Sequence, residues 1–304
     1  MGISSCLLGE NVRYDGGHCR DPFLVRVMGP YVEWVSVCPE MGMGMGRPRP
    51  TIRLVDDAGK TRLVESRGDA DHTEAMESYS RNKLAELDPS QMDGYVVKKN
   101  SPSCGLARIP VYRGEMKLHK EGMGVFTRIM RSQYPDLPVE EDGRLNDARL
   151  KESFVEQVFC RNRWRRVVAN GLTRSKLIEF HTAHKLQIRT HDETSYRKLG
   201  LMVGSAGRIP DAQLFEEYGR EFLRCIAIPA SAKRHINVMH HVMGYFKEIL
   251  PSPVKHELLR TIEDYRNGYV PLVVPISLLA FNAHQHQVEY LLGQVYFDPY
   301  PKEW

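Results

Sequence analysis

Three of the six cysteines stand in short Gly- or Pro-containing stretches, each directly after an apolar run. They are Cys6 in "SSCLLGENVRYDGG", Cys38 in "SVCPEMGMGMGRPRP" and Cys104 in "KKNSPSCG". Three thiolates that converge suit a soft metal or an iron–sulfur cluster, and a cluster held by three cysteines leaves one iron without a protein ligand. Any single cysteine is more simply a buried strand residue. Three of them in such loops favour a ligand set.

The other cysteines are expected to play no part in that set. Cys19, in "GGHC", is either a fourth ligand or a plain thiol, and we predict the plain thiol. Cys160 and Cys225 fall on apolar helix faces, so we expect them in the core. Six scattered cysteines in 304 residues do not form a disulfide scaffold.

The elements that carry the three cysteines are predicted to be parallel strands. The runs "GISSCLLG", "VEWVSVCPE" and "DGYVVKKNS" are typical of buried strands, and "DHTEAMESYSRNKLAEL" is typical of a helix capped by Asp71 or Thr73. This alternation predicts an α/β domain with a mostly parallel sheet over residues 1–145. Ligands bind outside the carboxyl ends of such strands, and each cysteine follows one of these ends.

Residues 146–304 are predicted to form an all-α domain. The segment "NDARLKESFVEQVFCRNRWRRVV" places Leu150, Phe154, Val155, Val158 and Phe159 on one helical face, with Asn146 or Asp147 as the cap. Further amphipathic helices are expected in "LTRSKLIEFHTAHKLQI", "DAQLFEEYGREFLRCI", "AKRHINVMHHVMGYFKEIL", "PVKHELLRTIEDYRNG" and "PISLLAFNAHQHQVEYLLGQ".

The charge of the chain points weakly to a polyanionic partner for its second half. Residues 1–150 hold 21 Lys and Arg against 22 Asp and Glu, whereas residues 151–304 hold 21 against 16. Basic residues with an aromatic neighbour, here Trp164, can contact phosphates or stack on bases. A solvated helix face is the alternative. The predicted RNA-binding residues are Arg161, Arg163, Arg165, Arg166, Lys233 and Arg234.

Several classes of protein are not supported by the sequence. No apolar run approaches the roughly 20 residues that span a bilayer, and "MGISSCLLGENVR" has neither a basic leader nor a cleavage site, so we expect a cytoplasmic protein without membrane contact. Neither a Walker loop nor a GxGxxG fingerprint occurs, so a nucleotide cofactor has no support.

The three cysteine motifs together resemble those of the thiouracil desulfidase family, over about residues 1–145. The resemblance implies a [4Fe-4S] cluster on Cys6, Cys38 and Cys104, whose free iron takes up the sulfur of a thiocarbonyl. It also implies Glu40 and Ser101 as the catalytic acid and hydroxyl. The second half is similar to a helical domain often fused behind this module. In such proteins the resemblance implies transfer RNA as the substrate carrier and 4-thiouridine as the modified base.

Further residues are predicted to contact the substrate. Arg13 and Asp15 in "VRYDGG" are placed to read a pyrimidine edge. Arg47 and Arg49 lie in a glycine-rich loop whose amides can approach a ligand, and Ser103 shares the loop of Cys104. Two alternatives remain open at this stage: a desulfidase of free thiobases, and a non-catalytic iron–sulfur or zinc protein that binds nucleic acid.

Overall fold

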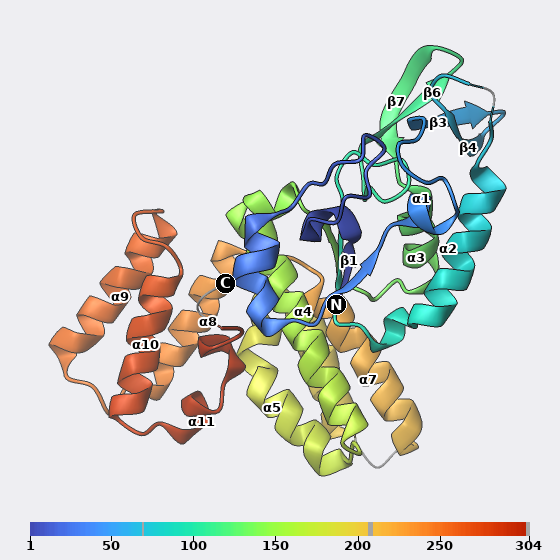
Figure 1. Ribbon diagram of the computed structural model, residues 1–304. Coiled ribbons are helices and arrows are strands. Elements are labelled where there is room, and N and C mark those ends of the chain that lie inside the picture. The colour runs from blue at the N-terminus through green and yellow to red at the C-terminus, as the bar shows by residue number, and fades with distance from the viewer. Residues whose placement is uncertain (69, 206–208, 302–304) are drawn as a thin grey trace. The chain divides into compact units, whose positions relative to one another are not determined.

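The computed structural model describes residues 1–68, 70–205 and 209–301 (Figure 1). The chain divides into two compact units, of which the first covers Met1–Val158 and the second begins at Phe159. The division falls within helix α4 (Ala148–Ala169). The domain boundary near residue 145 stays a prediction. Within the described ranges, none of the helices has the length and apolar character needed to cross a membrane.

A four-stranded parallel sheet organises the first unit. Its strands are β1 (Gly2–Ser4), β2 (Val35–Val37), β5 (Tyr95–Val97) and β8 (Val139–Glu141), in the order β2-β1-β5-β8. In register, Gly2 pairs with Val35 on one side and with Tyr95 on the other. The three strands expected to precede the cysteines are therefore neighbours, as predicted. The fourth strand, β8, was not anticipated.

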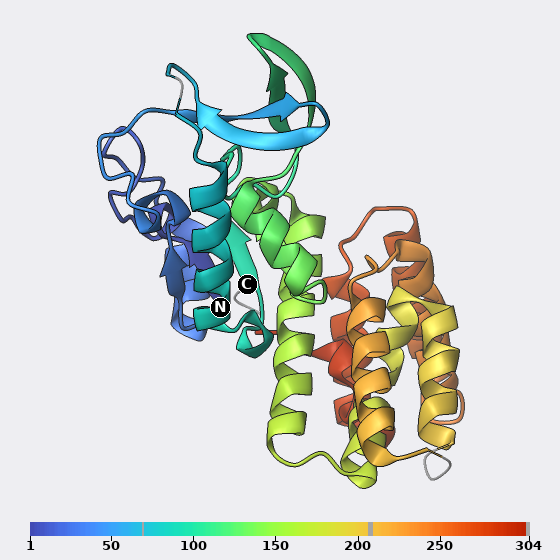
Figure 2. The same cartoon turned by 90° about the vertical axis from the view of Figure 1, so that its right-hand side faces the viewer.

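A second, mixed sheet belongs to the same unit. It consists of β3 (Ile52–Asp57), β4 (Lys60–Glu65), β6 (Ile109–Arg113) and β7 (Met116–Gly122), in the order β4-β3-β6-β7. Two antiparallel hairpins are joined by parallel pairing of β3 with β6. Figure 2 shows these hairpins at one end of the unit. The two hairpins turn at Gly59 and Gly114, which both have positive φ.

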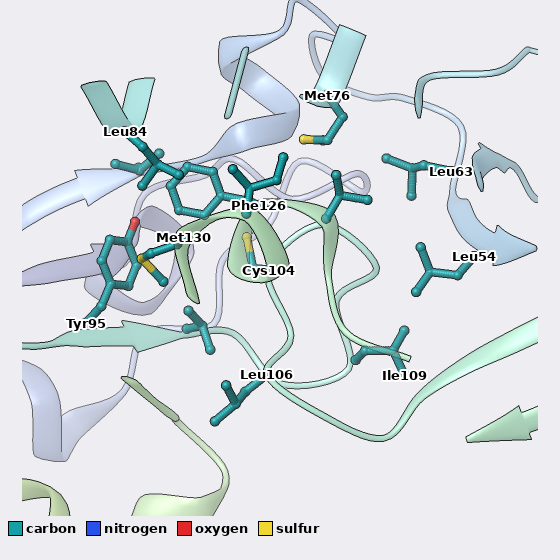
Figure 3. Close-up of a cluster of buried hydrophobic side chains, with 14 of the residues drawn as sticks. Leu54, Leu63, Met76, Leu84, Tyr95, Cys104, Leu106, Ile109, Phe126 and Met130 are labelled. Carbon is teal, nitrogen blue, oxygen red and sulfur yellow. The ribbon is translucent and has the colours of Figure 1, made fainter. Parts of the chain in front are cut away.

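Helices α1 (Pro39–Gly42), α2 (Thr73–Leu87) and α3 (Val125–Gln133) complete the first unit. The cap predicted at Asp71 or Thr73 was wrong, because His72 is the N-cap of α2. The Asp71 carboxylate nevertheless accepts the Thr73 N–H at 2.8 Å and so satisfies one free donor at the start of the helix. The core beneath α2 and α3 gathers side chains such as Met76, Leu84 and Phe126 (Figure 3).

The second unit is helical in its described residues, which confirms the predicted fold class. Asp147 accepts the N–H groups of Arg149 and Leu150 at the start of α4. Buried aromatic side chains of Trp164, Phe180, Tyr218 and Phe222 form one of its cores. Helix α6 was not anticipated. The helices after α4 are α5 (Arg174–His191), α6 (Glu193–Gly204), α7 (Asp211–Ile226), α8 (Ala232–Tyr245), α9 (Ser252–Arg266), α10 (Val273–Gln285) and α11 (Glu289–Leu292).

A cysteine-lined cavity as the candidate functional site

A cavity of about 420 Å³ opens at the carboxyl ends of β1, β2 and β5. Most of the residues predicted for the site line it, and so do Cys19 and Lys98. Asp15 and Arg47 are not among its lining residues. The predicted residues that the cavity brings together are Cys6, Cys38, Cys104, Glu40, Ser101, Ser103, Arg13 and Arg49.

Short helical turns present the first two cysteines. Cys6 lies in a 3-10 turn, Ser5–Leu8, directly after β1, and the turn ends at Gly9 in the left-handed conformation. Cys38 immediately precedes α1, and its sulfur lies 3.8 Å from the carbonyl oxygen of Val12. Both thiols are thus held by backbone that leaves a parallel strand and turns at once.

The loop that carries Cys104 docks on the N-terminus of α3. The first N–H groups of that helix lack partners within it, and three of them are satisfied by loop carbonyls. Gly124 donates to Gly105 at 2.8 Å, Val125 to Pro102 at 3.1 Å, and Phe126 to Ser103 at 2.9 Å. Figure 3 shows the Cys104 side chain next to Phe126, among the side chains of the apolar cluster to which it belongs.

Gly124 allows this close approach, because a Cβ atom there would lie 2.6 Å from the backbone of Ser103 and Cys104. We therefore expect Gly124→Ala to displace the cysteine loop, to lower the free energy of unfolding by about 1–3 kcal/mol and to reduce metal uptake. Chemical denaturation and metal analysis measure both effects. Gly244→Ala is the control, since nothing lies within 4 Å of its added Cβ. Unchanged metal uptake in Gly124→Ala would contradict the docking argument.

Acidic residues at the end of β8 also hold the loop that carries Cys104. Sequence reasoning missed these residues. The buried Glu141 carboxylate accepts the Leu106 N–H at 2.8 Å. Asp142 accepts the Lys99 N–H at 2.6 Å and pairs with the Lys98 ammonium at 2.7 Å. The run "VEED", with a β-branched residue followed by carboxylates, was the available signal for a fourth strand end at the site.

The cysteine thiols influence one another across the cavity. Burial raises the pKa of Cys6 to about 12, with further contributions from Cys19 and Cys38. Burial likewise raises the pKa of Cys104, and the neighbouring Cys38 and Glu40 add to the effect. Burial is also the main reason why the pKa of Cys38 is raised. Because metal ligands bind as thiolates, uptake of a cationic group must release protons here.

The donor set fits an iron–sulfur cluster better than a single ion. In the ranges that the structure describes, no three His, Cys, Asp or Glu side chains come close enough together to hold one metal ion. In an iron–sulfur cluster the cysteine ligands bind different irons, so the thiols must surround a cavity that can hold the cluster. Cys6, Cys38 and Cys104 stand around such a space.

A chain of hydrogen bonds runs beside Cys104 to Glu40. The Ser103 hydroxyl donates to Glu40 Oε1 at 2.6 Å and lies 2.8 Å from the Ser101 hydroxyl. Ser101 Oγ accepts the Cys104 N–H at 3.0 Å. Because each hydroxyl carries one hydrogen, Ser101 donates to Ser103 when Ser103 donates to Glu40. The chain therefore ends on the carboxylate, which faces the cavity.

Arg49 holds the other oxygen of that carboxylate. Its guanidinium contacts Glu40 Oε2 at 2.7 Å, and it also donates to the carbonyls of Gly46 at 2.9 Å and Val12 at 2.8 Å. The side chain is only 3% exposed. Arg49, predicted to contact the substrate, thus donates its hydrogen bonds to the protein itself. It positions Glu40 and links the loop that contains Val12 to the loop that contains Gly46.

We expect Arg49→Lys to slow turnover by about 10²-fold while metal content stays normal, because an ammonium keeps the charge but cannot hold three segments in one geometry. Steady-state kinetics measure the effect. In a Glu40→Gln background the same substitution should cost little more, since the two residues act as one unit. Arg113→Lys, at an exposed pair with Asp56, is the control. Additive losses in the double variant would contradict this positioning role.

The other residues predicted to contact the substrate, Arg13, Asp15 and Arg47, bind neighbouring protein groups. Arg13 donates to the Cys19 sulfur at 3.0 Å and pairs with Asp15 at 3.4 Å. The Gly17 N–H and Arg13 hold the pKa of Asp15 below its usual value. Arg47 donates to the carbonyl of Asn11.

The residues predicted to bind RNA differ in accessibility. Arg161 is buried, Arg163 donates to the carbonyl of Pro299, and Arg234 pairs with Asp192 at 3.3 Å. Arg165 is half-buried, whereas Arg166 and Lys233 are exposed.

The expectation that Trp164 stacks on a base was wrong. Its ring lies in the core, 5.2 Å from the ring of Phe180. Cys160 and Cys225 are fully buried, as predicted.

Comparisons with known proteins match the first and the second half of the chain to two different families. Residues 1–142 match the family described as 2-thiouracil desulfurase, and residues 185–301 match "Protein of unknown function (DUF1722)". The family resemblance of the first half is thereby confirmed.

Individual relatives each match about half of the chain. "Uncharacterized protein YbgA" of Escherichia coli is 29% identical over 52% of this chain and 94% of its own length. "Uncharacterized protein YbbK" of Bacillus subtilis is 28% identical over 48% of this chain and 97% of its own length. A solved structure, "[4Fe-4S]-dependent thiouracil desulfidase TudS", is 27% identical over 51% of this chain and 98% of its own, with a TM-score of 0.41.

Proposed function

We propose that this chain, whose first 142 residues match the 2-thiouracil desulfurase family, removes sulfur from 4-thiouridine in tRNA. The reaction exchanges C=S for C=O: water adds at the thiolated ring carbon, and sulfide leaves with the two protons of the water. No electrons are transferred overall. The observation that carries the proposal is the convergence of Cys6, Cys38, Cys104 and the Glu40 carboxylate on one cavity.

The residues around the cavity have separate roles in this proposal. Cys6, Cys38 and Cys104 would hold a [4Fe-4S] cluster, which supplies a soft Lewis acid for the thiocarbonyl sulfur. Glu40 takes a proton from the attacking water, Ser103 orients the carboxylate by its hydrogen bond, and Ser101 in turn hydrogen-bonds the Ser103 hydroxyl. Arg49 keeps the carboxylate facing the cavity.

RNA as the carrier is supported by charge. The second half holds five more basic than acidic residues, and Arg166 and Lys233 present exposed cations. A base in folded RNA must leave its stack to enter a cavity, which requires that the rest of the RNA be held elsewhere.

Two comparisons test the proposal. Protein purified without oxygen should be brown from iron and sulfide, and a colourless zinc protein would remove the proposed chemistry. Desulfuration of thiolated tRNA should be faster, at equal base concentration, than that of free 4-thiouridine or 2-thiouracil. Equal or faster turnover of the free bases would favour a thiobase desulfidase in which the helical half has another task.

Replacing Arg166 and Lys233 by Gln is expected to weaken tRNA binding and to flatten its salt dependence. Each phosphate contact that is lost removes roughly 0.7–0.9 from the slope of log affinity against log salt concentration. Filter binding over a salt series measures the slope. Arg220→Gln is a matched control on α7, because Arg220 is already paired with Glu216 at 2.5 Å. If the double variant keeps the wild-type slope, the RNA surface lies elsewhere.

A further inference from the structure

Cys19 lies beside Cys6 in a geometry that suits a covalent link. The Cys19 N–H donates to the Cys6 carbonyl at 2.9 Å. The α-carbon lies one bond from the amide nitrogen and two bonds from the carbonyl oxygen, so a hydrogen bond of this length keeps the two α-carbons within about 6.8 Å of each other, the upper end of the usual disulfide range. Both residues line the same cavity.

The surroundings of the two sulfurs differ. Cys19 is half-buried, and the Arg13 guanidinium lies 3.0 Å from its sulfur, an electropositive and partly exposed setting typical of reactive cysteines. Cys6, in contrast, is buried. Of these two thiols, Cys19 is therefore the one that a small oxidant in the cavity would meet first.

We propose that Cys6 and Cys19 form a reversible disulfide when no cluster occupies the cavity, with hydrogen peroxide as the oxidant. The Cys19 thiol and peroxide give a sulfenic acid and one water. The Cys6 thiol then displaces a second water from the sulfenic sulfur and closes the S–S bond. The two thiols lose two electrons, and the peroxide is reduced to two waters. A dithiol reductant restores both thiols.

The link has a consequence for the site that rests on the proposed function. A disulfide removes Cys6 from the ligand set, so an oxidised chain cannot take up its cluster until it is reduced. Cys19 therefore makes cluster uptake sensitive to peroxide without itself being a ligand.

Peptide mapping tests the link directly on the full chain. Cluster-loaded and chelator-stripped protein is treated with one equivalent of peroxide, blocked with N-ethylmaleimide and digested with trypsin. Cleavage after Arg13 separates the two cysteines into the peptides 1–13 and 14–20, so the disulfide appears as a linked pair in mass spectrometry. We expect the linked pair in most of the stripped protein and several-fold less in the loaded protein.

Cys19→Ser is the matched variant. Untreated, it should hold as much iron as the wild type. After peroxide it should take up iron and sulfide without a reductant, whereas the stripped wild type should need dithiothreitol first. Absence of the linked pair, or a pair between Cys19 and Cys38 instead, would overturn the proposal. Iron loss in untreated Cys19→Ser would also overturn it, by making Cys19 a ligand. A linked pair in a protein that never binds iron would leave the disulfide standing and remove the desulfidase.

Discussion

Replacing Cys104 by Ala is expected to leave the protein without cluster iron and without desulfidase activity. A methyl group cannot ligate iron, and the docked loop, residues 98–105, contains no second cysteine that could take the place of Cys104. Cys6→Ala and Cys38→Ala should have the same effect. Iron and sulfide analysis of protein purified without oxygen measures the loss, together with release of sulfide from thiolated tRNA.

The matched controls are two cysteines of the second unit. Cys160 and Cys225 are fully buried, with their sulfurs near Gln187 Oε1 and the carbonyl of Ile188. Cys160→Ala and Cys225→Ala should lower the free energy of unfolding by about 1–3 kcal/mol and leave the iron content intact. A Cys104→Ala protein that retained full iron and activity would rule out the ligand assignment.

Replacing Glu40 by Gln is expected to slow sulfur removal by about 10²–10⁴-fold, the usual range for the loss of a general acid or base. The amide keeps the shape of the side chain but cannot take a proton from water. Substrate affinity and iron content should change little, because neither the cysteines nor the exposed cations are altered. Single-turnover kinetics with thiolated tRNA separate the chemical step from binding.

This variant also leaves the buried Arg49 without its counter-ion, so the protein should become less stable. Glu40→Gln combined with Arg49→Met removes both charges and should regain stability without regaining activity. That pair of results separates a chemical role from a structural one. Full activity in Glu40→Gln would mean that the proton travels by another route.

The parallel strands and the cysteine positions could be predicted because both depend on local patterns. Each apolar run was short and ended in a Gly- or Pro-containing loop, and adjacent β1, β2 and β5 follow from that alternation. The second sheet was missed in part because β7, from Met116 to Gly122, is exposed over its first six residues and is largely polar, so it lacks the apolar run on which the strand predictions relied.

Side-chain partners were harder to predict than positions. Arg49 is identifiable in the sequence as a basic residue in a glycine-rich loop, but only the folded chain brings the carbonyls of Val12 and Gly46 to its guanidinium. Similarly, Trp164 between arginines is typical of a nucleic-acid surface, whereas its contacts with Phe180 and Tyr218 depend on how the helices pack.

The strand order β2-β1-β5-β8 also determines when the site can exist during synthesis of the chain. Strand β1 is synthesised first and lies inside the sheet. Its neighbour β5 begins only at Tyr95, and the edge strand β8 ends at Glu141. The entropic cost of closing such long loops arises before the pairing of the strands can stabilise the sheet, so the sheet forms slowly. While the ribosome is still making the residues before Cys104, Cys6 and Cys38 have no third partner. Iron delivery is therefore expected to follow translation of the first unit rather than to accompany it.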